Sequence, residues 1–248
     1  MDRVAFSIFG IDIMWYGILI SLGVVLGYLV AVRLAKIENI SENTILDILV
    51  WSLPLAIVGA RAYYVVFEWD YYSKNIKEII DIRGGGLAIY GGIIAAVGTC
   101  LVICKKRKLH FLKITDIFMP AIALGQAVGR WGNFINKEAY GRPTNLPWAI
   151  TIDGIKVHPT FLYESLGDFL IFLLLAYIFK NKKKFDGQIT SLYMIFYGIL
   201  RYFVEGLRTD SLYIGIFRVS QLVSIVIIII GITIQLKYKN KLLKSDEK

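Results

Sequence analysis

The stretch GQAVGRWGNFINKEAYG (residues 125–141) joins an apolar run, long enough to cross a membrane, to a cluster of polar side chains. Closely spaced glycines precede Arg130, Asn133, Asn136 and Glu138, so a guanidinium, two amides and a carboxylate lie beside backbone that can approach a ligand or another helix. Ionisable side chains are costly inside a bilayer and usually mark a functional site there. The stretch therefore predicts a membrane protein with a polar site at the end of one span.

The composition of the whole chain supports a membrane protein. Of its 248 residues, 56% are hydrophobic, whereas a soluble domain has about 45–50% even with glycine counted. Lys and Arg outnumber Asp and Glu by 28 to 19, but they gather in short loops between apolar runs, which indicates membrane topology rather than nucleic-acid binding. Cys100 and Cys104 lie one helical turn apart in an apolar run, which favours packing over a metal or redox site. We expect no metal, no cofactor and no nucleic-acid partner.

Seven apolar runs have the length of a helical membrane span, about 20 residues. They predict an all-α polytopic membrane protein with one integral membrane domain over residues 1–248. The expected spans are roughly residues 13–32, 45–67, 84–104, 114–134, 157–179, 188–204 and 219–236. Basic clusters follow the first, third, fifth and seventh runs, and such clusters mark the cytoplasmic side. We therefore expect the N-terminus outside and the C-terminus in the cytoplasm, with residues 135–156 as an extracytoplasmic loop.

A short β-ribbon is expected where this loop meets the fifth span. Residues 148–157 alternate apolar positions around Asp153-Gly154, a pair typical of a two-residue hairpin turn. The fold prediction is thus seven transmembrane helices with a small extracytoplasmic β-ribbon.

The sixth expected span carries charges on one face. Tyr197, Arg201, Glu205 and Arg208 are spaced by four, four and three residues and line one side of a helix. An arginine in the membrane costs at least about 2.5 kcal/mol, so something in the bundle must offset it. Two interpretations are open: an internal ion-pair ladder from Arg201 through Glu205 to Arg208, or an anion site in which Glu205 holds one or both arginines.

Two further motifs could serve the same site. The glycines of residues 84–92 surround Tyr90, and they suit either close packing or phosphate binding at a helix N-terminus. In residues 158–164, Pro159 suits a first helical turn, and the lone His158 is more often structural than catalytic. Arginines, tyrosines, amides and glycines together predict a site for a negatively charged lipid head group. A secondary transporter of an anionic solute is the alternative, and an inactive scaffold is a third possibility.

These motifs resemble those of the phosphatidylglycerol–prolipoprotein diacylglyceryl transferases of bacterial inner membranes. The resemblance covers about residues 16–208 and keeps the family's motif order. It rests on Trp15-Tyr16-Gly17, Gly59-Ala60-Arg61 with Tyr64, the Gly85 to Gly92 block, the Gly129 to Gly141 signature, His158 to Glu164, and Tyr197-Gly198 with Arg201, Glu205 and Arg208.

The resemblance implies transfer of the diacylglyceryl group from phosphatidylglycerol to the lipobox cysteine thiol of a prolipoprotein. The reaction forms a thioether, releases glycerol phosphate and needs no metal or diffusible cofactor. The expected partners are therefore phosphatidylglycerol, the prolipoprotein signal peptide and the bilayer. The expected location is the bacterial cytoplasmic (inner) membrane, with the site toward its extracytoplasmic face.

By motif position, the resemblance also implies which residues bind the lipid. The expected head-group part consists of Arg130, Asn133, Glu138 and Gly141. The part nearest the reacting phosphate ester consists of Arg201, Tyr197 and Glu205, with Arg208 on the same helix face. Tyr16 and Arg61 are expected to complete the cavity.

One position departs from the family pattern. Members often carry a histidine before a Gly-Gly pair, where this chain has Tyr90. A tyrosine with a pKa of about 10 is a poor base for a thiol with a pKa of about 8.5. We hypothesise that Arg130 and Arg201 clamp the phosphate and stabilise the departing oxygen, while their field favours the thiolate. Tyr90 stays a candidate catalytic residue, and the identity of the base stays open.

Overall fold

The structure is a computed structural model that describes residues 3–82 and 85–246. The chain forms two compact units. Unit 1 comprises Met1–Ile37 and Thr115–Lys248, and unit 2 comprises Glu38–Ile114. The expected start of the third span, at residue 84, lies outside the described residues.

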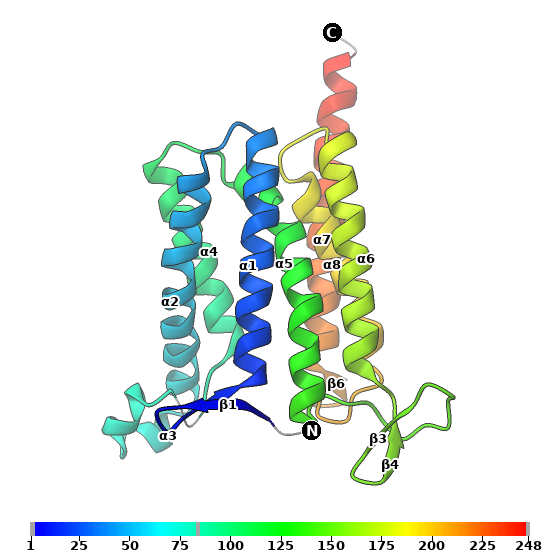
Figure 1. Ribbon diagram of the computed structural model, residues 1–248. Helices are drawn as coiled ribbons and strands as arrows, with labels where there is room; N and C mark the ends of the chain where they lie inside the picture. Colours follow the sequence, from blue (N-terminus) through cyan, green and yellow to red (C-terminus); the bar gives the residue numbers. More distant parts are fainter. Residues whose placement is uncertain (1–2, 83–84, 247–248) are drawn as a thin grey trace. The chain divides into compact units, whose positions relative to one another are not determined.

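Unit 2 is built on two long helices, α2 (Glu42–Phe67) and α4 (Ile89–Lys106), which pack side by side (Figure 1). The short helix α3 (Trp69–Tyr72) and the 3-10 helix η1 (Ile76–Ile80) lie between them in the sequence. The two long helices touch backbone to backbone, since a Cβ atom on Gly91 would lie 2.3 Å from the carbonyl oxygen of Gly59. Only glycine allows this approach, which explains part of the glycine block around Tyr90.

Unit 1 contains α1 (Trp15–Ile37), most of α5 (Phe111–Asn136), α6 (Thr160–Asn181), α7 (Gln188–Glu205) and α8 (Val219–Asp246). The described residues of unit 1 also form three antiparallel hairpins: β1 (Val4–Ile8) with β2 (Ile11–Met14), β3 (Ile150–Ile152) with β4 (Ile155–Val157), and β5 (Tyr213–Ile214) with β6 (Phe217–Arg218).

The β3–β4 hairpin confirms the expected β-ribbon. Its turn residues Asp153 and Gly154 both have positive φ angles, 49° and 86°, as a two-residue turn that matches the strand twist requires. The hairpins of β1–β2 and β5–β6 were not expected from the sequence.

Among the described residues, six helices are long and apolar enough to cross a membrane: α1, α2, α4, α5, α6 and residues Val219–Tyr238 of α8. The chain is therefore a mostly helical, polytopic membrane protein. Helix α7 matches the expected sixth run in position but is not one of the six, because Arg201, Glu205 and several tyrosines lower its hydropathy. The seventh span and the orientation of the termini stay predictions.

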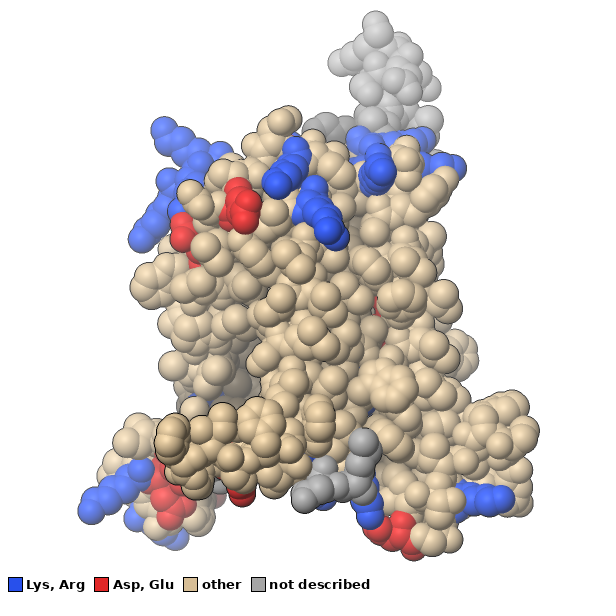
Figure 2. All heavy atoms as spheres, viewed as in Figure 1, with Lys and Arg blue, Asp and Glu red and all other residues tan. Residues whose placement is uncertain are grey.

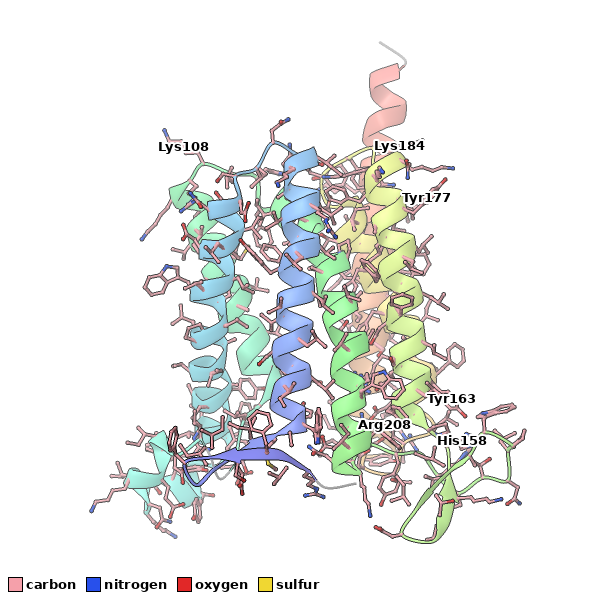
Figure 3. All side chains as sticks on the ribbon, in the orientation of Figure 1. Lys108, His158, Tyr163, Tyr177, Lys184 and Arg208 are labelled. Atoms are coloured by element: carbon pink, nitrogen blue, oxygen red, sulfur yellow. The ribbon has the colours of Figure 1, made fainter. Side chains whose placement is uncertain are left out.

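The two ends of unit 1 differ in their side chains. The end of α5, the start of α6 and the β3–β4 hairpin lie together (Figure 1), and His158, Tyr163 and Arg208 lie at this end (Figure 3). Lys184 and Tyr177 lie at the opposite end, where α6 finishes (Figure 3). Figure 2 shows lysine and arginine side chains gathered at that opposite end, with almost no charge along the visible faces of α1 and α6. We call the end with His158 and Arg208 the polar end of unit 1.

Candidate functional site

One carboxylate joins the two arginines that the sequence singled out. Glu164 lies in the second turn of α6 and is only 3% exposed. One of its oxygens lies 2.9 Å from Nε of Arg130 on α5, and the other accepts a hydrogen bond from Nη1 of Arg201 on α7. Three helices thus meet at one charged cluster, which we call the Arg130–Glu164–Arg201 cluster.

Packing between α5 and α6 fixes the position of this cluster. Phe134 and Phe161 stack with ring centroids 4.5 Å apart, one helical turn from Arg130 and Glu164. Beside them, the indole of Trp131 donates a hydrogen bond to Oγ of Ser165, and this hydroxyl donates to the carbonyl of Ala127. These contacts set the rotation of both helices, so that Arg130 and Glu164 face each other.

The two arginines differ in how many of their guanidinium nitrogens have hydrogen-bond partners. Arg201 donates to Glu164 through Nη1 and to Glu205 through Nη2, the latter at 2.6 Å. Within the described residues, the ion pair with Glu164 is the only polar contact of Arg130. The terminal nitrogens of Arg130 therefore keep hydrogen-bond donors for a ligand. Arg201 can bind a ligand through Nη1 or Nη2 only after the ligand displaces Glu164 or Glu205.

The two interpretations of the α7 charges can now be compared with the contacts. Glu205 pairs with Arg201, as both interpretations expected. The second step of the ladder is absent from the described part of the chain, because Arg208 pairs with Asp210 through two hydrogen bonds of 2.9 and 2.7 Å. The hydrogen bonds from Arg208 lower the pKa of Asp210 below its ordinary value. Glu205 thus holds one of the two arginines, Arg201, which Glu164 also contacts, while Arg208 pairs with Asp210.

The side-chain amides of Asn133 and Asn136, at the end of α5, bind Glu138 in the loop that follows. Asn133 donates a hydrogen bond of 2.8 Å to Glu138, and Asn136 donates a weaker one of 3.5 Å to the same carboxylate. Gly141 donates its N–H to the carbonyl of His158 and forms a β-bridge with Arg208. These contacts tie the end of α5 to the residues that flank α6 and α7, so the loop borders the cluster without supplying a contact to Arg130.

Two tyrosines expected at the site also lie in unit 1. Tyr16, at the start of α1, packs its ring on Gly132, where a Cβ atom would lie 2.3 Å from Cδ2 of the ring. Tyr197 lies one turn before Arg201 on α7 and stacks on Tyr193, with ring centroids 5.4 Å apart. Both tyrosines are partly exposed.

The remaining expected residues, Arg61 and Tyr90, belong to unit 2. Arg61 is buried, and its guanidinium donates to the carbonyls of Glu78, Ile79, Gly85 and Gly86 at 2.6–3.0 Å. The guanidinium carbon of Arg61 also lies over the ring of Tyr72, 5.0 Å from the ring centroid. Arg61 therefore holds the loop between α2 and α4. Tyr90 lies in the first turn of α4.

The sequence did not select two acidic residues of α6 as site residues. Glu164 and Asp168 are both buried, and they lie one turn apart on the same side of the helix. The available signal was the presence of two carboxylates inside an apolar span, because such charges need partners on neighbouring helices. Within the described residues, no group of three or more His, Cys, Asp or Glu side chains could hold a metal ion.

Comparison with known proteins identifies the family. The model of the prolipoprotein diacylglyceryl transferase family matches residues 3–237. A protein of Finegoldia magna named phosphatidylglycerol–prolipoprotein diacylglyceryl transferase is 85% identical, over 100% of both chains. A protein of the same name from Clostridioides difficile is 50% identical over 100% of both chains. Another from Clostridium novyi is 45% identical over 97% of this chain and 98% of the relative. The chain therefore belongs to the prolipoprotein diacylglyceryl transferase family.

Proposed function

We propose that this protein transfers the diacylglyceryl group of phosphatidylglycerol to the lipobox cysteine of prolipoproteins, the first step of lipoprotein maturation. The observation that carries the proposal is the Arg130–Glu164–Arg201 cluster, which brings two guanidinium groups from different helices to one point inside a membrane protein. Family membership supplies the reaction and its substrates. The arginines supply what that reaction needs most, a binding site for a phosphodiester anion within an apolar bundle.

In the proposed reaction, the cysteine sulfur attacks the glycerol carbon that carries the phosphate. The new carbon–sulfur bond forms as the carbon–oxygen bond to phosphate breaks, and the thiol proton finally resides on the released glycerol phosphate. Negative charge therefore grows on the departing phosphate oxygen, where fixed guanidinium donors stabilise the transition state most effectively.

Arg130 and Arg201 take different parts in this scheme. Arg130 offers its terminal nitrogens to the phosphate first, because its only polar partner among the described residues is Glu164. Arg201 completes the clamp when the phosphate replaces Glu164 at Nη1, while Glu205 keeps holding Nη2. Glu164 thus acts as a stand-in for the lipid phosphate when no lipid is bound, since both are anions with paired oxygens.

The incoming thiol needs no strong base in this account. A positive field lowers the pKa of a thiol and raises its thiolate fraction. Tyr90 then need not accept the proton, and it stays a candidate catalytic residue. The other candidate residues of unit 1, which are expected to bind the lipid, are Tyr16, Asn133, Glu138, Gly141, Tyr197 and Arg208. Arg61 of unit 2 stays a candidate for lipid binding.

We also propose seven spans, with the polar end of unit 1 outside and the C-terminus in the cytoplasm. Helix α7 supports the seventh span, because Arg201 and Glu205 point at partners within the bundle and need not face lipid. The lysines that end α6 support the orientation, because short loops rich in Lys and Arg stay in the cytoplasm. In a bacterium this membrane is the cytoplasmic (inner) membrane.

The test is a transfer assay with purified protein, phosphatidylglycerol labelled in its acyl chains and a peptide with a lipobox cysteine. The proposal expects label on the peptide together with one glycerol phosphate for each peptide modified. A peptide with serine in place of the cysteine should stay unlabelled. Transport of an anionic solute into liposomes without any peptide labelling would contradict the proposal and favour the transporter alternative, which family membership does not support.

A further inference from the structure

The strongest unexplained feature of unit 1 is the carboxylate of Asp168. Asp168 is 0% exposed, and neither of its side-chain oxygens has a hydrogen-bond partner within the described part of the chain. An unpaired carboxylate inside a membrane bundle costs several kcal/mol. Nearly all buried polar groups have partners, so a ligand donor is the natural explanation.

The position of Asp168 places it next to the phosphate clamp. It follows Glu164 by four residues on α6 and therefore lies one helical turn, about 5.4 Å, further along the same side. It is close enough to interact electrostatically with Arg130, Glu164 and Arg201. The carboxylate thus belongs to the surroundings of the clamp, although it forms no ion pair with either arginine.

The neighbouring helices contribute polar groups at the same depth. Gln126 lies one turn before Arg130 on α5, and Tyr197 lies one turn before Arg201 on α7. Gln126 accepts a hydrogen bond of 2.8 Å from the hydroxyl of Tyr193, and the Tyr197 hydroxyl makes no hydrogen bond within the described residues. Asp168, Gln126 and Tyr197 therefore form a polar layer one helical turn from the charged cluster, on the side away from the polar end of unit 1. In this layer the Asp168 oxygens and the Tyr197 hydroxyl have no hydrogen-bond partner among the described residues.

The chemistry of the substrate decides which group would occupy this layer. The lipid phosphate offers only acceptors and a negative charge, so a carboxylate repels it. Acyl chains offer no donor, and a thiol is a weak one. The glycerol head group carries two neighbouring hydroxyls, whose two donors complement the two oxygens of Asp168, on a three-carbon chain that can span one helical turn from the phosphate.

We propose that Asp168 binds the hydroxyls of the glycerol head group and makes the enzyme selective for phosphatidylglycerol over phospholipids without these hydroxyls. The proposal rests on the proposed function, since it places the phosphate at Arg130 and Arg201. Asp168 then determines lipid specificity and takes no part in breaking or forming bonds.

The experiment compares two lipids with three proteins. The lipids are phosphatidylglycerol and phosphatidylmethanol, which keeps the phosphodiester and the diacylglyceryl group but has no head-group hydroxyl. The proteins are wild type, Asp168→Asn and the control Ser165→Ala. Ser165 is also buried on α6, and its hydrogen bonds to Trp131 and Ala127 help to set the rotation of α5 and α6, so its loss should affect both lipids by the same factor.

The wild type should prefer phosphatidylglycerol in kcat/KM by roughly tenfold or more, the value of a hydrogen bond to a charged group. Asp168→Asn should lose most of that preference through slower reaction of phosphatidylglycerol, with phosphatidylmethanol nearly unchanged. Ser165→Ala should keep the wild-type ratio. Asp168→Ala provides a second variant, which should show the same loss of preference if the asparagine variant folds poorly.

The results separate the subsite from the overall function. If wild type transfers no diacylglyceryl group from either lipid, both the function and the subsite are wrong. If wild type transfers but the Asp168 variants slow both lipids by the same factor, the function stands and the subsite is overturned, because a structural role or a role toward the thiol affects both lipids equally.

Discussion

The substitution Glu164→Gln tests the charged cluster most sharply. It keeps the shape of the side chain but removes the charge that two arginines share, at 2.9 Å from Nε of Arg130 and in direct contact with Arg201. Loss of one charge-assisted hydrogen bond is worth about 1.5–3 kcal/mol. In the transition state Glu164 holds Arg130 through Nε, because the phosphate has replaced it at Arg201, so loss of this contact should lower kcat roughly 10- to 150-fold. The KM for phosphatidylglycerol should not rise, because the cluster becomes more positive and attracts the phosphate more strongly.

The same substitution should also lower stability. Breaking one side of a buried ion pair costs up to about 3–5 kcal/mol, and for a chain of this size each kcal/mol lowers the unfolding midpoint by about 2–4 °C. The midpoint is measured in detergent at one heating rate. The control Asp153→Asn breaks an exposed pair with Lys137, whose side chains are 75% and 48% exposed, and such pairs contribute at most about 1 kcal/mol. A large rise in KM with unchanged kcat would refute the reasoning, because Glu164 would then contribute uniform binding.

Three further substitutions test other parts of the account. Tyr90→Phe should keep transfer to a lipobox peptide within a few-fold of wild type, whereas loss of transfer with intact lipid binding would give its hydroxyl a direct role in proton transfer. Gly91→Ala should lower the unfolding midpoint by the equivalent of about 1–3 kcal/mol, because its Cβ meets the backbone of α2; Gly98→Ala on the same helix has open space and should be neutral or slightly stabilising. Asp210→Asn should lower the midpoint slightly at neutral pH. Arg208 lowers the folded-state pKa of Asp210, so this contribution is present above pH about 4 and is lost as the pH falls through the lowered pKa; an equal difference at pH 7 and below pH 3 would contradict it.

The sequence predicted contacts within one element better than contacts between elements. The pair of Arg201 with Glu205 followed from a spacing of four residues on a helix, and the turn at Asp153 followed from the residue pair that a hairpin needs. The approach of Glu164 to Arg130 depends on how α5 and α6 rotate about their axes. Aromatic stacking and the hydrogen bonds of Ser165 determine that rotation, and no spacing within one helix reveals it.

The glycines of residues 84–92 in unit 2 are a second case in which the sequence did not predict contacts between elements. They fitted either phosphate binding or close packing, and the structure uses Gly91 for contact between α2 and α4. The resemblance made Arg61 a candidate for the lipid cavity, and an arginine in a membrane span needs partners. The structure supplies them as four backbone carbonyls from the loop that follows α2, and loop backbone cannot be positioned from sequence patterns.

The most direct test of the central claim measures diacylglyceryl transfer and glycerol phosphate release together in the variants Arg130→Lys and Arg201→Lys. Lysine keeps the charge but cannot present the planar pair of donors that a guanidinium offers to a phosphate. The account predicts that each variant loses transfer and release in parallel, by roughly tenfold or more, while both variants keep the helical fold. Near wild-type rates in either variant would contradict the claim that Arg130 and Arg201 together clamp the phosphate of the lipid.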